Sequence, residues 1–286
     1  MKHLLITSVV LALLAGLGWA TSSTLAVTWA GVPLPLLLAG VAVLVNVVAF
    51  VPSFGARTEK YYDLLGSVTF LSLVATSAAV AHAQGGWSLR QWAMAAMVSV
   101  WTVRLGAFLF QRVHETGGDG RFDAIKQSAS RFLLAWVLQA SWCFITGLAV
   151  WVALSTPDAA GWGWTTTVGA VLWGLGFATE VVADAQKNAF RRREPKAQPW
   201  IDEGLWSRSR HPNYFGEITL WTGLFIMGAG SFSGGQWLAV LSPLWTAFLL
   251  LKVSGVPMVD ARALRRWGDN ADYQAYRART RKLWPF

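Results

Sequence analysis

The segment 209–217 gathers side chains that can form hydrogen bonds or carry charge between two apolar stretches of the chain. It reads Ser-Arg-His-Pro-Asn-Tyr-Phe-Gly-Glu. Because the missing N–H of proline costs nothing at the first position of a helix, we expect a helix to begin at Pro212. Asn213, Glu217 and Trp221 follow one another at intervals of four residues and share one face of this helix, which would point away from lipid. The segment is therefore a candidate site; the alternative is a capped helix start with a surface acid.

Further charged and phenolic side chains lie within or beside other apolar stretches. They are Glu59, Tyr61, Tyr62, Asp63, Arg104, Glu180, Asp184, Lys187 and Arg191. A charge at the centre of a membrane helix costs about 2.5–3.5 kcal/mol on insertion scales, so each such residue needs a functional or a structural reason. We expect these side chains to line one water-filled cavity in the cytoplasmic half of a bilayer.

The same residues also allow a structural interpretation. Glu59 could form an interfacial ion pair with Lys60, and Arg104 could extend to the inner membrane surface. Glu180 and Asp184 could pair with Arg210 only to hold helices together. These alternatives stay open at the level of the sequence.

The composition is that of an integral membrane protein. Of the 286 residues, 54% are hydrophobic and only 14% are charged, whereas about 25% of an ordinary globular chain is charged. We predict an all-α, polytopic helical bundle with about seven or eight transmembrane helices, since a helix needs roughly 20 apolar residues to cross the hydrocarbon core. The expected spans lie near 4–20, 33–52, 63–83, 91–111, 131–154, 163–186, 213–231 and 236–256.

The basic residues predict the orientation of the chain. When the spans are threaded from a cytoplasmic N-terminus, all 24 Lys and Arg residues except Arg90 and Arg104 fall on the inner side. By the positive-inside rule we expect both termini in the cytoplasm, in a bacterial inner membrane. The net charge of +9 would also attract anionic lipid, whereas nucleic-acid binding is not expected because the basic residues do not gather on one soluble face.

One membrane domain, residues 1–286, accounts for the whole chain, with N-terminal spans in 1–56 and the candidate site in 57–286. We expect the first span to be retained rather than cleaved as a signal peptide. The inner loops at 112–130 and 187–212 and the tail after residue 257 are polar, so a charged ligand belongs on the cytoplasmic face. The tail predicts short basic and aromatic helices at the membrane surface. Cys143 is the only cysteine, and the His spacing fits no metal site.

Three motifs carry a resemblance to a known family. They are Thr-Glu-Lys-Tyr-Tyr-Asp at 58–63, Gly-Gly-Asp-Gly-Arg-Phe-Asp at 117–123, and the stretch from Gly204 to Glu217. From about Arg57 to its C-terminus the chain resembles the steroid 5-alpha-reductase-like membrane reductases, and among them the bacterial subgroup DUF1295. The Arg-His-Pro-x-Tyr element alone also resembles membrane methyltransferases that act on isoprenylcysteine or phospholipid with S-adenosylmethionine.

The resemblance implies NADPH-dependent reduction of a carbon–carbon double bond conjugated to a carbonyl, in a steroid-like or other lipid substrate. Residue by residue it implies that Asp184 and Arg191, together with Asn213, Glu217 and Trp221, bind the cofactor. It also implies that Glu59 polarises the carbonyl. The Tyr that partners this Glu in the family would lie near Trp101, where the chain departs from the pattern, so Tyr62 or Tyr61 is expected to take its place.

The residue types fit this chemistry. Hydride delivery to an enone leaves an enolate, which a protonated Glu59 or a Tyr hydroxyl in a dry pocket would stabilise. The basic residues favour NADPH over NADH, since they can pair with a pyrophosphate and a 2′-phosphate. The full set expected to bind the cofactor is Arg104, Glu180, Asp184, Lys187, Arg191, Arg208, Arg210, His211, Asn213, Tyr214, Glu217 and Trp221. A membrane methyltransferase is the alternative, and a non-catalytic lipid-binding or transport protein comes third. No obligate protein partner is expected.

Overall fold

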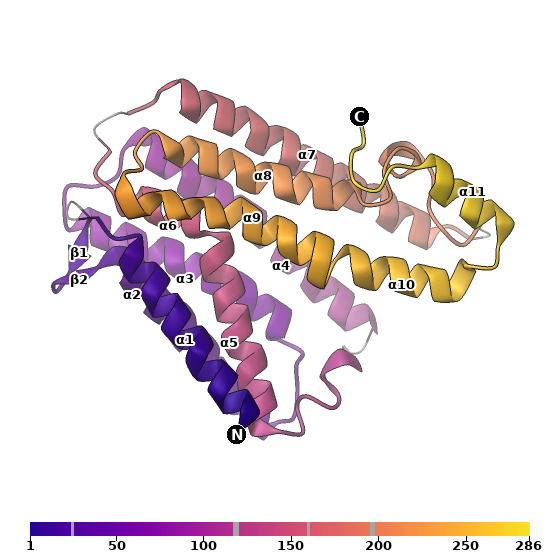
Figure 1. The fold of residues 1–286 in the computed structure, drawn as a ribbon, viewed down its shortest axis with the longest axis horizontal. Coiled ribbons are helices and arrows are strands. Elements are labelled where there is room, and N and C mark those ends of the chain that lie inside the picture. The colour runs from indigo at the N-terminus through magenta and orange to yellow at the C-terminus, as the bar shows by residue number, and fades with distance from the viewer. Residues whose placement is uncertain (24–25, 117–119, 159–160, 195–197) are drawn as a thin grey trace. The chain divides into compact units, whose positions relative to one another are not determined.

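The computed structural model describes residues 1–23, 26–116, 120–158, 161–194 and 198–286, almost all of them in helices or short turns (Figure 1). The all-α fold class predicted from the sequence is confirmed. The chain divides into two compact units. The first comprises Met1–Thr166 and Met227–Leu241, and the second comprises Thr167–Ile226 and Ser242–Phe286.

The membrane character predicted from composition is also confirmed. Within the described ranges, 6 helices are long and apolar enough to span a bilayer, or up to 7 when a pair bent by 60° counts as one span. The sequence suggested eight stretches. The stretch 213–231 forms a helix but is not among these candidates, because Asn213, Tyr214 and Glu217 make its first turns polar. The spans are Lys2–Ala20, Leu34–Gly55, Tyr62–His82, Leu89–Gln111, Trp164–Arg192 and Gly234–Trp267, with Ala129–Thr146 and Leu148–Leu154 as the bent pair.

The first unit is built around α5 (Ala129–Thr146), which packs against α1 (Lys2–Ala20), α2 (Leu34–Gly55) and α3 (Tyr62–His82). Next to α3 runs α4 (Leu89–Thr116), and the short η1 (Gly120–Phe122) follows it in the chain. The sharp bend after α5 leads into α6 (Leu148–Leu154), which is buried throughout. The bend occurs at Gly147, where an added Cβ would overlap the indole of Trp151. The predicted span over 131–154 is therefore this bent pair of helices.

A small hairpin joins α1 to α2. Its strands, β1 (Thr28–Trp29) and β2 (Val32–Pro33), pair antiparallel. The two residues of the turn, Ala30 and Gly31, have φ angles of 49° and 78°. Positive φ at both central positions defines the tight turn whose twist matches that of paired strands, and glycine adopts it without strain.

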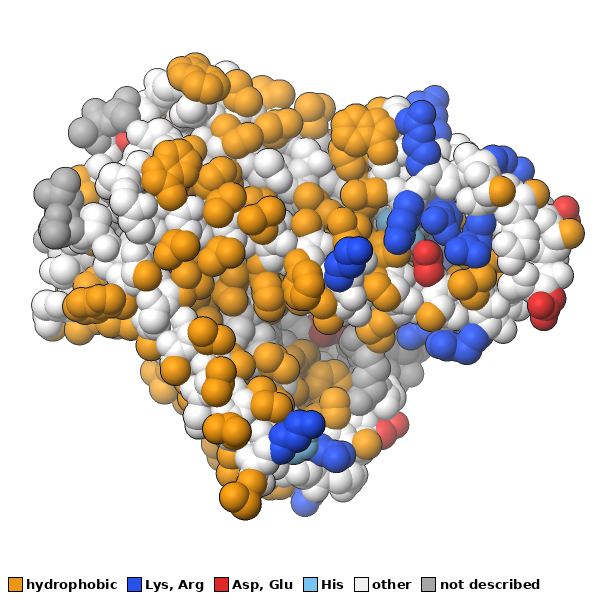
Figure 2. All heavy atoms as spheres, viewed as in Figure 1, with side chains coloured by type: hydrophobic (Ala, Val, Ile, Leu, Met, Phe, Trp, Pro, Cys, Tyr) orange, Lys and Arg blue, Asp and Glu red, His pale blue; other side chains and the backbone are white. Residues whose placement is uncertain are grey.

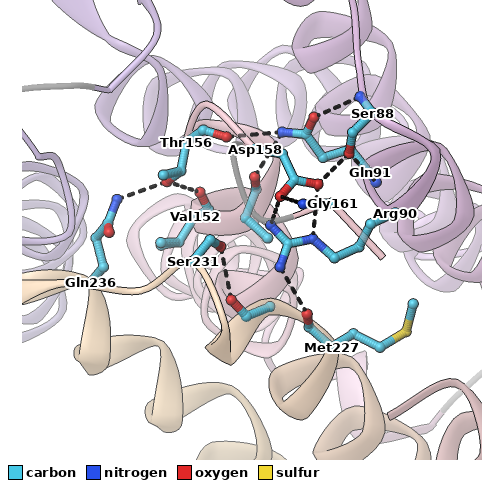
Figure 3. Close-up of polar contacts among 12 residues, drawn as sticks. Ser88, Arg90, Gln91, Val152, Thr156, Asp158, Gly161, Met227, Ser231 and Gln236 are labelled. Carbon is cyan, nitrogen blue, oxygen red and sulfur yellow. Dashed lines mark hydrogen bonds and ion pairs between the residues drawn. The ribbon is translucent and has the colours of Figure 1, made fainter. Parts of the chain in front are cut away.

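A buried polar network closes one end of the first unit (Figure 3). Its centre is Arg90, only 1% exposed, whose Nη2 lies 2.5 Å from Oδ1 of Asp158. The Nε of Arg90 donates to Oδ2 of the same carboxylate at 3.1 Å, and its Nη1 donates to the carbonyl of Met227 at 3.4 Å. Beside this pair, Gln91 donates to two carbonyls of the chain around α6, and Gln236 donates to Thr156. Arg90, which the predicted orientation placed on the outer side of the membrane, is thus a buried charge paired with Asp158.

The second unit contains most of α7 (Trp164–Arg192) and α8 (Pro212–Ala229), which run side by side (Figure 1). Glycines let their backbones approach closely. A Cβ added to Gly176 would lie 2.6 Å from the carbonyl oxygen of Gly216, and one added to Gly223 would lie 2.6 Å from that of Gly169. Small residues at such contacts are typical of membrane helix pairs. These glycines therefore allow the close packing of α7 against α8.

The C-terminal part of the second unit folds back on the start of α8. After α9 (Leu241–Phe248) and a π-helical turn, η4 (Leu249–Val253), come α10 (Val256–Trp267) and α11 (Ala271–Arg279). Trp200, Tyr273 and Tyr276 form a buried cluster with Trp267 packed against it. The backbone N–H of Arg210 donates to the carbonyl of Arg281 at 2.9 Å. The tail is therefore an integral part of the unit that carries the 209–217 segment.

Candidate functional site

The start of α8 is organised around His211. As expected, Pro212 is the first residue of the helix. His211 is 2% exposed, and its Nε2 lies 3.0 Å from Oδ1 of Asp260 on α10. Its ring stacks on that of Tyr214, with centroids 5.4 Å apart. Burial lowers the pKa of His211 below its usual 6.5, which favours the neutral imidazole near pH 7.

Asp260 joins two residues of the expected site. Besides His211, Arg210 approaches the same carboxylate, with its Nη1 3.5 Å from Oδ2. Asp260 was not among the residues expected in the site, because the tail was interpreted as surface helices. No local signal links it to the segment 209–217, since 49 residues separate it from His211.

A second contact joins α7 to α8. The Nδ2 of Asn213 donates to Oδ1 of Asp184 at 3.3 Å, and Asp184 is only 8% exposed. One turn earlier on α7, Glu180 is buried to 3% exposure. On α8, Glu217 is half-buried and Trp221 is fully buried. The structure therefore brings together the acid and the amide that the resemblance had assigned to one cofactor site.

The second unit also carries three cationic side chains, Lys187 and Arg191 on α7 and Arg208 farther along the chain. The Nζ of Lys187 lies 4.7 Å above the ring of Trp206, whose own N–H donates to the carbonyl of Ala183. Arg191 and Arg208 are exposed. Arg208 also borders a hollow of about 390 Å³, together with Val182, Gln186, Gly204, Leu205 and Ser207. These groups provide both hydrogen bonds and positive charge for an anionic ligand.

The turn that holds Arg208 is fixed to α7. η2 (Gly204–Ser207) begins at Gly204, which has a φ of 58° and touches the amide of Gln186 so closely that a Cβ would overlap it. The Oε1 of Gln186 accepts the N–H of Leu205 at 3.0 Å. Only glycine fits this position without strain or overlap. Of the expected cofactor residues, Arg104 lies elsewhere, half-buried on α4 of the first unit.

The first unit carries the other expected cluster, around Glu59. Glu59 is 9% exposed, and the Nζ of Lys126 lies 2.8 Å from its Oε2. Lys126 also lies 3.1 Å from Asp123, and its carbonyl accepts a hydrogen bond from Arg57 at 3.0 Å. The hydrogen bond to Glu59, followed by that to Asp123, raises the pKa of Lys126. The ammonium in turn favours the charged form of Glu59, so the proton of this pair rests on Lys126.

The two tyrosines near Glu59 have different surroundings. The hydroxyl of Tyr62 donates to the carbonyl of Ala135 at 2.8 Å, and its ring packs on Phe122 and Trp136. Tyr61 is 53% exposed. Trp101, which stands where the family pattern has a Tyr, is fully buried against Phe70.

Lys126 is the functional candidate that sequence reasoning missed. It lies between η1 and α5, three residues after Asp123, and nothing in its spacing pointed to Glu59. Part of the expected pattern lies outside the described residues: Gly117, Gly118 and Asp119 of the second motif, and the basic residue Lys196.

A family model described as a protein of unknown function, DUF1295, matches residues 49–280. The chain belongs to this family. The DUF1295 resemblance stated from the motifs is thereby confirmed, and the family is a steroid 5-alpha-reductase-like one. No curated protein and no solved structure matches the chain. The matched range contains both clusters, Glu59 with Lys126 in the first unit and the segment 209–217 in the second.

Proposed function

We propose that this DUF1295 protein is a membrane-embedded reductase that uses NADPH to reduce a carbon–carbon double bond conjugated to a carbonyl in a steroid-like or other lipid substrate. The contact between Asp184 and Asn213, in a unit that also carries Lys187, Arg191 and Arg208, supports the proposal. A carboxylate and an amide can bind the amide and hydroxyl groups of a dinucleotide, and arginines pair well with its phosphates.

The residues of the second unit fit such a cofactor. Arg208 offers charge beside the hollow of about 390 Å³, which is also bordered by the polar side chains of Gln186 and Ser207, and Lys187 lies over the ring of Trp206. Arg191 extends the basic region at the end of α7. We assign phosphate binding to these cations and assign the position of the nicotinamide end to Asn213 and Glu217. The neutral His211, held by Asp260, fixes the start of α8.

The residues of the first unit fit proton donation. NADPH, when bound, supplies the hydride. Addition of a hydride to the β-carbon of an enone leaves negative charge on the carbonyl oxygen, which a proton donor in a poorly hydrated site stabilises. Lys126 carries the proton and Glu59 orients it at 2.8 Å. Tyr61 and Tyr62 are the alternative donors, although the Tyr62 hydroxyl already donates to Ala135.

A membrane methyltransferase that uses S-adenosylmethionine is the second candidate, because the Arg-His-Pro-x-Tyr element at 210–214 fits that class too. The basic side chains of the second unit, Lys187, Arg191 and Arg208, favour the reductase. A cationic sulfonium gains nothing from neighbouring arginines, whereas a 2′-phosphate does.

Calorimetry on the purified protein in detergent tests the proposal. We expect NADPH to bind at least about tenfold more tightly than NADH, the effect of one charge-assisted contact of about 1.5–3 kcal/mol. Arg208→Gln should remove most of this preference, while Arg266→Gln, an equal loss of charge on α10, should keep it. Binding of S-adenosylmethionine without binding of NADPH would contradict the reductase and support the methyltransferase.

We further propose that the protein resides in a bacterial inner membrane with both termini in the cytoplasm, as the distribution of Lys and Arg supports. Reporter fusions after residues 120, 200 and 286 should then report the cytoplasm. Fusions near residues 86 and 159 should report the outer side. A C-terminal fusion that is active only outside the cytoplasm would contradict this orientation.

A further inference from the structure

Helix α10 presents two unlike faces. One face packs within the second unit: Val256 is buried, Asp260 binds His211, and Ala263 and Trp267 pack on the cluster around Trp200. These residues are spaced by three or four and so share one side of the helix. The opposite side of α10 carries Met258, Arg262 and Arg265, whose side chains are exposed.

The opposite face borders a shallow hollow of about 270 Å³. Its lining consists of Pro257, Met258, Ala261, Arg262 and Arg265. Two guanidinium groups one turn apart therefore stand beside apolar side chains, and Met258 is 37% exposed. Figure 2 shows Lys and Arg side chains gathered over the end of the second unit formed by α10 and α11. The hollow combines positive charge with an apolar wall.

The two arginines of this hollow lack counter-ions. Among the described residues, neither Arg262 nor Arg265 pairs with a carboxylate, whereas Arg210, Arg193 and Arg279 each do. The one acid of α10, Asp260, is turned to the packed face, where it binds His211. The hollow is thus a place where a ligand with negative charge would gain two charge-assisted contacts without displacing a protein partner.

The position in the chain indicates what this ligand is. α10 is the last part of the candidate span Gly234–Trp267 and carries three arginines, as expected where a helix leaves the hydrocarbon core. Val259 and Leu264 on its flanks are each 38% exposed. A free phosphate needs no apolar neighbours, whereas a phospholipid brings a phosphate together with glycerol and acyl chains.

We propose that Arg262 and Arg265 bind the headgroup phosphate of an anionic phospholipid, with Met258 and Pro257 against the glycerol and the start of its acyl chains. This site is separate from the proposed cofactor site and does not depend on it. It makes the last helices a lipid-specific anchor rather than a generally basic surface.

Native mass spectrometry of the detergent-purified protein tests this site with added phosphatidylglycerol or phosphatidylcholine. We expect one phosphatidylglycerol to be retained several-fold more than phosphatidylcholine, and the double variant Arg262→Gln and Arg265→Gln to lose this retention about tenfold. The matched control is Arg266→Gln with Lys282→Gln, which removes the same charge outside the hollow and should retain the lipid. Size-exclusion profiles verify that both variants are folded.

Three outcomes would overturn the proposal. Equal retention of the two lipids would show that the hollow does not recognise net negative charge. Equal loss in both double variants would show attraction by overall charge alone. Displacement of the lipid by glycerol phosphate at matched concentration would show a site for free phosphate, and the apolar wall would then have no role.

Discussion

Glu59→Gln is expected to lower turnover of a suitable enone by about 10²–10⁴, the usual contribution of a positioned general acid, because Lys126, the proposed proton donor, loses the carboxylate that positions it; the affinity for NADPH should stay near that of the unchanged protein. The reason is the ion pair in which Lys126 lies 2.8 Å from Glu59. Glutamine keeps the size of the side chain but removes the charge that orients the ammonium. Steady-state kinetics together with calorimetry for NADPH separate the two effects.

The chain offers a matched control for this variant. Asp123 also contacts the Nζ of Lys126, at 3.1 Å, but its side chain is 72% exposed. An exposed ion pair contributes little, so Asp123→Asn should change turnover only slightly. Glu217→Ala, which removes a proposed cofactor-binding side chain, should weaken NADPH binding. Full turnover in Glu59→Gln, or a loss of NADPH affinity as severe as in Glu217→Ala, would show that Glu59 does not take part in the reaction. Phe replacements of Tyr61 and Tyr62 would then test the remaining donors.

Asp158→Ala is expected to destabilise the protein by about 3–5 kcal/mol, because it leaves the guanidinium of Arg90 buried without its counter-ion. Both side chains of this pair are 1% exposed, and Arg90 also donates a hydrogen bond to the carbonyl of Met227 near the end of α8 (Figure 3). The thermal midpoint in detergent should fall by roughly 10 °C. Adding Arg90→Met to Asp158→Ala should recover part of the loss, since the second change removes the stranded charge.

An exposed pair gives the comparison. Arg193 and Glu203 lie 2.8 Å apart, with side chains 54% and 44% exposed. Such a pair contributes about 0–1 kcal/mol, so Glu203→Ala should barely change the midpoint. If Asp158→Ala were no more destabilising than Glu203→Ala, the buried network would not hold this end of the first unit together.

Local patterns predicted the elements of this fold well. The length of the apolar stretches predicted most of the spans, and Pro212 predicted the start of α8. The four-residue spacing predicted that Asn213 faces away from lipid, and in the structure it contacts α7. These features depend on neighbours a few residues away in the chain. The bend at Gly147 could not be predicted, because it depends on how the ring of Trp151 fills the space beside the glycine.

Partners distant in the chain were not predictable from periodicity. Glu59 and Lys126 are 67 residues apart, and Arg90 and Asp158 are 68 residues apart. A pattern shows which face of a helix a residue occupies, but packing decides what meets that face. Arg90 therefore seemed to be an outer surface charge, and the likeness to reductases suggested a protonated Glu59 where the structure places an ion pair with Lys126.

Transfer of a labelled hydride tests the central claim most directly. The purified protein is incubated with a lipid-soluble enone and NADPH that carries deuterium at the transferable position of the nicotinamide, and the product is examined by mass spectrometry and NMR. We predict one deuterium on the carbon β to the carbonyl, with one NADPH consumed for each product. Methyl transfer from S-adenosylmethionine to a lipid or to isoprenylcysteine, with no NADPH consumed by any enone tried, would contradict the account.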